Sequence, residues 1–109
     1  MISTDTEQTL APVVAGSGLL ALDVIFGPDG PVALPGGTCA NVLLSLGEMG
    51  HVTMPIARLG QDQPGMLIDD EFRRVGAVRE GLCHDPSIST PIILQPTFRT
   101  PFAPANNLQ

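Results

Sequence analysis

The sequence predicts an α/β fold, in which a small parallel sheet is covered by helices and a β-hairpin lies outside the parallel set. Short apolar stretches typical of strands alternate along the chain with stretches whose apolar residues recur at helical spacing. Twelve glycines and eleven prolines divide the 109 residues into short elements. Apolar residues make up 43% of the chain and charged residues only 15%, so a buried core is expected.

The first elements are predicted to be two strands and a returning hairpin strand. Residues 12–15 and 22–26 are apolar runs bounded by glycine or proline, as strands are. Residues 27–31 read Gly-Pro-Asp-Gly-Pro, in which proline fixes φ, aspartate caps the turn and glycine accepts a positive φ. Residues 32–34 are therefore expected to fold back beside residues 22–26. Prolines on both sides of the returning strand indicate that it is an edge.

The later elements are predicted to alternate between helix and strand. A helical stripe predicts a helix over residues 38–49, and a β-rich run predicts a strand over residues 52–59. A second helix is expected after Asp62, an N-cap residue type that is followed by a proline in the first turn. Short strands are expected within residues 79–84 and 88–95. This order favours parallel pairing of the strands that helices connect.

Composition divides the chain into three parts. Residues 1–11 are expected to be a polar N-terminal tail, residues 12–95 one domain, and residues 96–109 a proline-rich, irregular tail. No helix is expected after the last strand, which leaves an apolar face and an edge of the sheet exposed. The sequence therefore indicates a fragment of a larger α/β protein.

Charge and cysteine content restrict the expected partners and location. The net charge is −6, and none of the five basic residues is a lysine, so repulsion from phosphate makes nucleic acid and membrane partners unexpected. The N-terminus is polar and acidic, unlike a signal peptide, and no apolar run approaches the roughly 20 residues of a membrane span. Cys39 and Cys83 form no Cys-x-x-Cys pair, so a reducing, cytoplasmic location is expected.

Residues 16–21, Gly-Ser-Gly-Leu-Leu-Ala, match the Gly-x-Gly-x-x-Ala pattern of a dinucleotide-binding turn. That pattern requires a helix of several turns directly afterwards, whereas residues 22–26 are β-rich. The acidic residue expected about 20 positions further on is also missing. A dinucleotide site is an alternative that a strand at residues 22–26 would exclude.

Asp23 is the first candidate ligand-binding residue. It interrupts an apolar run, where a carboxylate is costly unless it is paired or faces solvent. Strand alternation places Asp23 on the same face as Ile25 and opposite Leu22 and Val24. A ligand role and an exposed strand position both remain open from the sequence alone.

The segment from Gly36 to Asn41 holds the other candidates. Two glycines, Gly36 and Gly37, precede a helix and leave backbone N–H groups open to a ligand oxygen. Asn41 lies in the first turn, where its amide can donate to and accept from a polyhydroxy ligand. The alternative is a plain glycine turn, with Thr38 as the N-cap and Asn41 on the helix surface.

Other polar segments have structural explanations. Residues 60–65 are explained as a strand-to-helix turn with an aspartate cap. Cys39 is expected to be a small buried side chain, because no pattern links it to His51 or His84 as a nucleophile. His84 follows Cys83, but two such residues do not make a metal site. No catalytic residue and no metal ligand is therefore assigned.

Taken in order, several segments resemble the ribokinase family of sugar kinases, which includes the phosphofructokinase-B group. The resemblance covers residues 12–95. The segments are Val13 to Phe26 with its internal Asp23, the helix start Gly36-Gly37-x-x-Ala40-Asn41, the turn Ala57-Arg58-Leu59-Gly60-x-Asp62-x-x-Gly65 and the helix end Val75-Gly76. The helix start departs from the family pattern at Cys39, where a small residue is usual, and at Leu43, where Ser, Thr or Ala is usual.

The resemblance implies the N-terminal part of a doubly wound α/β kinase with a short β-hairpin lid. The whole family member transfers the γ-phosphoryl group of ATP, with Mg²⁺, to a hydroxyl of a sugar or nucleoside. The resemblance further implies that Asp23 binds substrate hydroxyls, and that Gly36 and Gly37 approach the sugar through their backbone. Asn41 hydrogen-bonds the sugar, and residues 90–95 return to the lid.

The family places its catalytic base and anion hole in a Gly-Ala-Gly-Asp element, which these 109 residues lack. Because phosphoryl transfer depends on stabilising the charge of the transferred group, the chain alone is expected to be inactive and to bind neither ATP nor Mg²⁺. The sequence leaves open which sugar or nucleoside is bound. An alternative from another class is a non-catalytic binding or self-association module, which would use the lid hairpin or the exposed sheet edge, for instance in a homodimer.

Overall fold

The computed structural model describes residues 12–96 of the chain. Its elements are β1 (Val13–Ser17), β2 (Ala21–Gly27), β3 (Gly30–Gly36), α2 (Thr38–Glu48), β4 (Val52–Gly60), α3 (Gln63–Arg74), β5 (Leu82–Asp85) and β6 (Ile92–Pro96). Each strand and helix expected from the sequence is present. The expected N-terminal tail, residues 1–11, lies outside the described residues, as does all of the expected tail 96–109 except Pro96.

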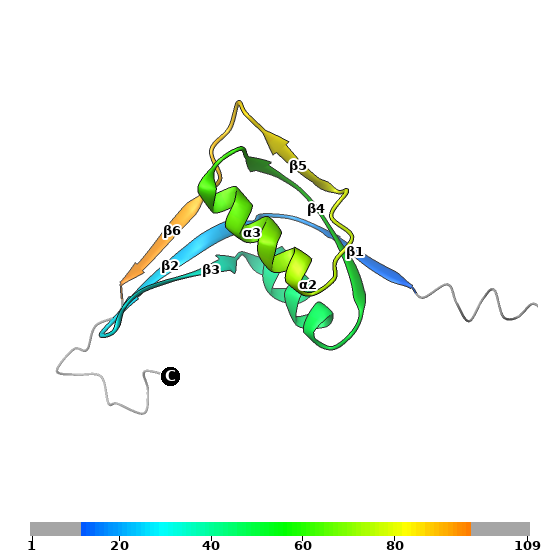
Figure 1. Cartoon of the computed structure of the whole chain (residues 1–109), viewed down its shortest axis with the longest axis horizontal. Coiled ribbons are helices and arrows are strands. Elements are labelled where there is room, and N and C mark those ends of the chain that lie inside the picture. The colour runs from blue at the N-terminus through cyan, green and yellow to red at the C-terminus, as the bar shows by residue number, and fades with distance from the viewer. Residues whose placement is uncertain (1–11, 97–109) are drawn as a thin grey trace, which may run out of the picture.

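Strands β1, β4 and β5 form the core sheet, in the order β1-β4-β5. Both pairs are parallel, with Val13 opposite Val52 and Ala57 opposite Leu82. Helices α2 and α3 pack on one face of this sheet (Figure 1). The predicted parallel set is therefore confirmed, and so is its connection through helices.

Strands β2, β3 and β6 form a second sheet, the hairpin sheet, in the order β3-β2-β6. Strand β2 pairs with β3 in antiparallel fashion across a turn in which Gly30 has a φ of 105°. Strand β6 pairs with β2 in parallel, with Leu22 opposite Ile92. Among the described strands β3 is an edge of this sheet, which confirms the prediction from its flanking prolines. The hairpin thus stands outside the core sheet, as expected.

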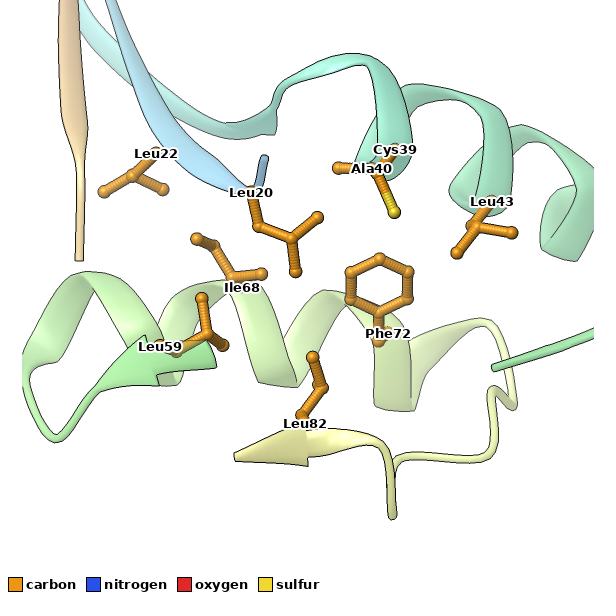
Figure 2. Packing of buried hydrophobic residues seen from close by; sticks show 9 residues of the cluster. All are labelled: Leu20, Leu22, Cys39, Ala40, Leu43, Leu59, Ile68, Phe72 and Leu82. Carbon is orange, nitrogen blue, oxygen red and sulfur yellow. The ribbon is translucent and has the colours of Figure 1, made fainter. Parts of the chain in front are cut away.

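The buried core lies between the two helices and the inner ends of both sheets. Figure 2 shows its nine side chains: Leu20, Leu22, Cys39, Ala40, Leu43, Leu59, Ile68, Phe72 and Leu82. Leu59, Ile68 and Phe72 have no exposed surface. The expectation that Cys39 is a small buried residue is confirmed, and burial raises the pKa of its thiol. No helix in residues 12–96 is long and apolar enough to cross a membrane.

The dinucleotide alternative is wrong. Residues 21–27 form strand β2, and no helix follows the Gly-x-Gly-x-x-Ala segment until α2 begins at Thr38. A pyrophosphate site of that kind needs the helix N-terminus directly after the glycines, because the helix supplies the N–H groups and the dipole. The β-branched and aromatic residues that follow it, Val24, Ile25 and Phe26, instead pair with β3 and β6 in the hairpin sheet.

Candidate functional site

Asp23 and Gly36 are brought into contact by the hairpin. Asp23 lies opposite Leu34 in the β2–β3 ladder, and Gly36 is two residues further along β3 on the same face. Gly36 is therefore a diagonal neighbour of Asp23. A Cβ atom at position 36 would lie 2.2 Å from both Cγ and Oδ2 of Asp23, so only glycine leaves room for the carboxylate in this position.

One carboxylate oxygen of Asp23 is buried without a partner. Within the described residues, Oδ1 of Asp23 accepts no hydrogen bond, although it is shielded from solvent. An unsatisfied buried acceptor costs about 1–3 kcal/mol, and more when the group is charged. Native structures rarely keep such an atom without a role. The only comparable atom in this part of the chain, the hydroxyl oxygen of Thr53 in β4, belongs to a neutral group. The carboxylate of Asp23 is therefore the better candidate for binding a hydrogen-bond donor.

Gly37, not Thr38, caps helix α2, which corrects the alternative in which Thr38 was the N-cap. Gly37 has a φ of 93°, and no side chain accepts a hydrogen bond from the first turn. A Cβ atom at position 37 would lie 2.3 Å from the carbonyl oxygen of Leu19. Glycine is therefore required both for the backbone conformation and for the close approach. Gly37 holds the N-cap position without a capping side chain, so backbone N–H groups of the first turn keep no intrahelical acceptor.

Asn41 lies on the first turn of α2. Its backbone N–H donates to the carbonyl oxygen of Gly37 at 3.0 Å, and its side chain is exposed. A groove of about 380 Å³ runs between the end of β1 and the start of α2, and Gly18, Gly37 and Thr38 are among its lining residues. Asp23 and Asn41 do not line this groove. The structure thus places Asp23 against Gly36, and it places Gly37 at the groove. Asn41 is linked to Gly37 only through its backbone N–H.

Sequence reasoning missed Thr90, which completes the turn at residues 60–65. The carboxylate of Asp62 caps α3 by accepting from the N–H of Gly65 at 2.9 Å, as expected. It also accepts from the N–H of Thr90 at 2.9 Å and from the Thr90 hydroxyl at 2.7 Å. The bonds from Thr90 and Gly65 hold the pKa of Asp62 below its usual range. No local pattern marks Thr90, because it lies 28 residues from Asp62.

The basic side chains of the described residues are engaged with other groups of the chain. Each of their arginines is paired with a carboxylate: Arg58 with Asp85, Arg73 with Asp70, Arg74 with Glu71 and Glu48, and Arg79 with Asp69. His84 is held between Asp69 and the carbonyl oxygen of Gly60. Within residues 12–96 no three His, Cys, Asp or Glu side chains lie close enough together to hold a metal ion.

The fold is shared with several solved kinases. A fructokinase from Xylella fastidiosa with bound ATP superposes with a TM-score of 0.73 at 21% identity, over 80% of this chain and 30% of that one. An aminoimidazole riboside kinase from Salmonella enterica, complexed with aminoimidazole riboside and an ATP analogue, gives a TM-score of 0.70 at 23% identity, over 76% and 28%. A fructokinase from Halothermothrix orenii gives 0.69 at 22% identity, over 78% and 34%.

These comparisons establish the fold class. The described part of the chain has the fold of part of a ribokinase-like carbohydrate kinase, as the sequence resemblance implied. The chain spans about a third or less of the length of the three solved kinases. No protein-family model matches the sequence, and no curated protein matches it.

Proposed function

We propose that this chain is the substrate-binding and lid portion of an ATP-dependent carbohydrate kinase, and that it binds a sugar or nucleoside through Asp23. The observation that carries the proposal is the buried, unpartnered Oδ1 atom of Asp23. A ligand hydroxyl that donates to this atom forms a charge-assisted hydrogen bond, which is about twice as strong as a neutral one. The shared fold of sugar and nucleoside kinases supports a polyhydroxy ligand.

Three further residues have proposed roles around that ligand. Gly36 leaves space for the carboxylate of Asp23, which keeps the acceptor in place. Gly37 and the uncapped first turn of α2 offer backbone N–H groups to ligand oxygens. The exposed amide of Asn41 can both donate and accept. In this proposal the hairpin sheet is a lid over the ligand, and residues 12–95 form the folded unit.

Phosphoryl transfer is proposed to need groups outside this chain. The sequence contains no Gly-Ala-Gly-Asp element, and the described arginines are engaged with carboxylates. ATP and Mg²⁺ would therefore be held by other parts of a complete kinase, and the chain alone would bind the acceptor without catalysis. The absence of a Cys-x-x-Cys pair in the sequence supports action in the reducing cytoplasm.

Ligand-dependent thermal unfolding tests this proposal. The chain is unfolded by heat with and without fructose, ribose and a set of nucleosides, and Asp23→Ala is compared with Asp70→Ala, which removes an exposed carboxylate on α3. A ligand at about 100 times its Kd stabilises the native state by roughly 2.7 kcal/mol. We expect one ligand class to raise the Tm of the chain and of Asp70→Ala but not of Asp23→Ala. An equal rise in Asp23→Ala would exclude Asp23 as the ligand acceptor.

Self-association is a second proposal, which the exposed apolar side chains of the hairpin sheet support. Val32 and Leu34 of β3 are 54% and 48% exposed, and the pairing register places them on the same face of this sheet as Ile93, which is 40% exposed. Contiguous apolar surface of this kind is typical of protein contacts. Sedimentation equilibrium of the chain over a hundredfold range of concentration tests this, and a monomer throughout would remove the proposal.

A further inference from the structure

A buried hydrogen-bond network lies where the chain leaves the core sheet and enters the hairpin sheet. Thr90 follows β5, precedes β6 and is only 4% exposed. Its hydroxyl donates to Oδ1 of Asp62 at 2.7 Å and accepts from the N–H of Gly60 at 2.8 Å. Its backbone N–H donates to Oδ2 of Asp62 at 2.9 Å. Every polar group of the Thr90 side chain and its N–H is therefore satisfied by the turn between β4 and α3.

Two glycines of this turn are required by the network. A Cβ atom at Gly60 would lie 2.4 Å from Oδ2 of Asp62 and 2.9 Å from the backbone nitrogen of Thr90. A Cβ atom at Gly65 would lie 2.9 Å from the hydroxyl oxygen of Thr90. The spacing Gly-x-Asp-x-x-Gly thus does more than cap α3, because both glycines leave the space that Thr90 occupies.

The network is close in the chain to the candidate ligand acceptor. The carbonyl oxygen of Pro91, directly after Thr90, accepts from the N–H of Leu22 at 2.9 Å. Leu22 is the residue before Asp23, and β6 then continues beside β2 in parallel. In Figure 1 the connection from β5 descends past the start of α3 into β6. One hydrogen bond and two peptide links therefore separate Thr90 from Asp23.

We propose that Asp62 and Thr90 are positioning residues, which fix strand β6, and with it the Asp23-bearing strand β2, at one orientation to the core sheet. The other two connections between the sheets contain Gly18 and Gly37, which have φ values of 152° and 93° and no side chain to hold them. Within residues 12–96, only the connection at Thr90 is fastened to the core by side-chain hydrogen bonds. The role of Asp62 and Thr90 in orienting the hairpin sheet is argued from this geometry alone. Their influence on ligand affinity rests in addition on the proposed function.

Amide hydrogen exchange, measured residue by residue on the 109-residue chain, tests the proposal. Thr90→Val keeps the shape of the side chain but removes its hydroxyl, while Thr90→Ser keeps the hydroxyl. We expect Thr90→Val to speed exchange in β2 and β6 by about tenfold or more and to leave β1 and β4 within about twofold. The Gly60 amide at the end of β4 is left out of that comparison, because the variant removes its acceptor. Thr90→Ser should restore slow exchange in β2 and β6. Ser87→Ala is the matched control, because its hydroxyl lies in the same connection and bonds only to Asp85.

Two results would overturn the proposal. Equal acceleration in both sheets would mean that Thr90 contributes to global stability and positions nothing, and unchanged exchange in β2 and β6 would mean that the network holds nothing in place. Should Thr90→Val fail to fold, Asp62→Asn is the second variant, since asparagine still caps a helix. The unaltered chain supplies a further check: fast exchange of the Gly60 and Thr90 amides would show that the network is not formed.

Ligand affinity separates this proposal from the proposed function. If Asp23 binds the ligand, Thr90→Val should weaken binding by about tenfold through misplacement of Asp23, and Thr90→Ser should restore it. Accelerated exchange in the hairpin sheet together with no ligand binding by the unaltered chain would sustain the positioning role and refute the proposed function. Unchanged exchange in Thr90→Val together with ligand binding by the unaltered chain would refute the positioning role and leave the proposed function standing.

Discussion

The core sheet and the hairpin sheet differ in how they are stabilised. The core sheet is covered by two helices. The layer between sheet and helices contains three side chains with no exposed surface: Leu59 of β4, and Ile68 and Phe72 of α3. The hairpin sheet is buried only at its inner end, at Ala21, Leu22 and Gly36, and its outer residues such as Leu94 remain exposed. Local stability follows buried apolar contact, so the hairpin sheet is the part expected to open first. Stability therefore resides in one region, and the candidate ligand acceptor is carried by the other.

Phe72→Ala should have the largest effect and tests the first half of this comparison. Phe72 is fully buried between the two helices (Figure 2), and loss of such a side chain costs about 3–5 kcal/mol of unfolding free energy. Val32→Ala, in the exposed part of the hairpin sheet, should cost about 0.5 kcal/mol or less. Urea unfolding followed by circular dichroism measures both, since the chain has no Trp or Tyr for fluorescence. Similar losses of unfolding free energy in the two variants would contradict the view that the core sheet, and not the hairpin sheet, holds most of the stability.

Gly36→Ala should have an intermediate effect that is confined to the hairpin sheet. The added methyl group would overlap the carboxylate of Asp23, and such overpacking costs about 1–3 kcal/mol. The same unfolding experiment, made on Gly36→Ala, Asp23→Ala and the double variant, measures the coupling between the two positions. Because the clash needs both side chains, we expect the double variant to lose less unfolding free energy than the two single variants lose together. Strict additivity would mean that Asp23 and Gly36 do not touch in solution.

The same comparison explains what could be predicted from the sequence. The order of elements was predictable because glycines and prolines mark the turns and because apolar spacing separates helix from strand. The candidate pair Asp23 and Gly36 was also within reach, since the turn at residues 27–31 sets the hairpin register that makes them neighbours. These features depend on residues close together in the chain.

Two features could not be predicted, each for a physical reason. The cap of α2 depends on whether the Thr38 side chain or the positive φ of Gly37 ends the preceding strand, and both have suitable residue types. The contact of Thr90 with Asp62 depends on where the connection from β5 crosses to the second sheet. That crossing is decided by the packing of both sheets against the core, which no local spacing encodes.

Acidic pH should produce the smallest effect and distinguish the link between the sheets from local contacts. The pKa of Asp62 is lowered from 3.8 in the folded chain, so between the folded and unfolded pKa values the unfolded state binds more protons. The stability that Asp62 contributes is complete above the unfolded value and is lost as the pH falls through the folded one.

Urea unfolding from neutral pH down to pH values below the unfolded pKa of Asp62 measures this loss. Asp62→Asn should flatten the decline, because it removes the titrating group. Asp85, whose pKa is lowered by the hydroxyl and N–H of Ser87, is the matched control. Asp85→Asn should also flatten the decline, but without faster exchange in β2 and β6, because its carboxylate bonds within the β5 connection and to Arg58. A hairpin sheet that opens equally in both variants would mean that Asp62 does not link the two regions in particular.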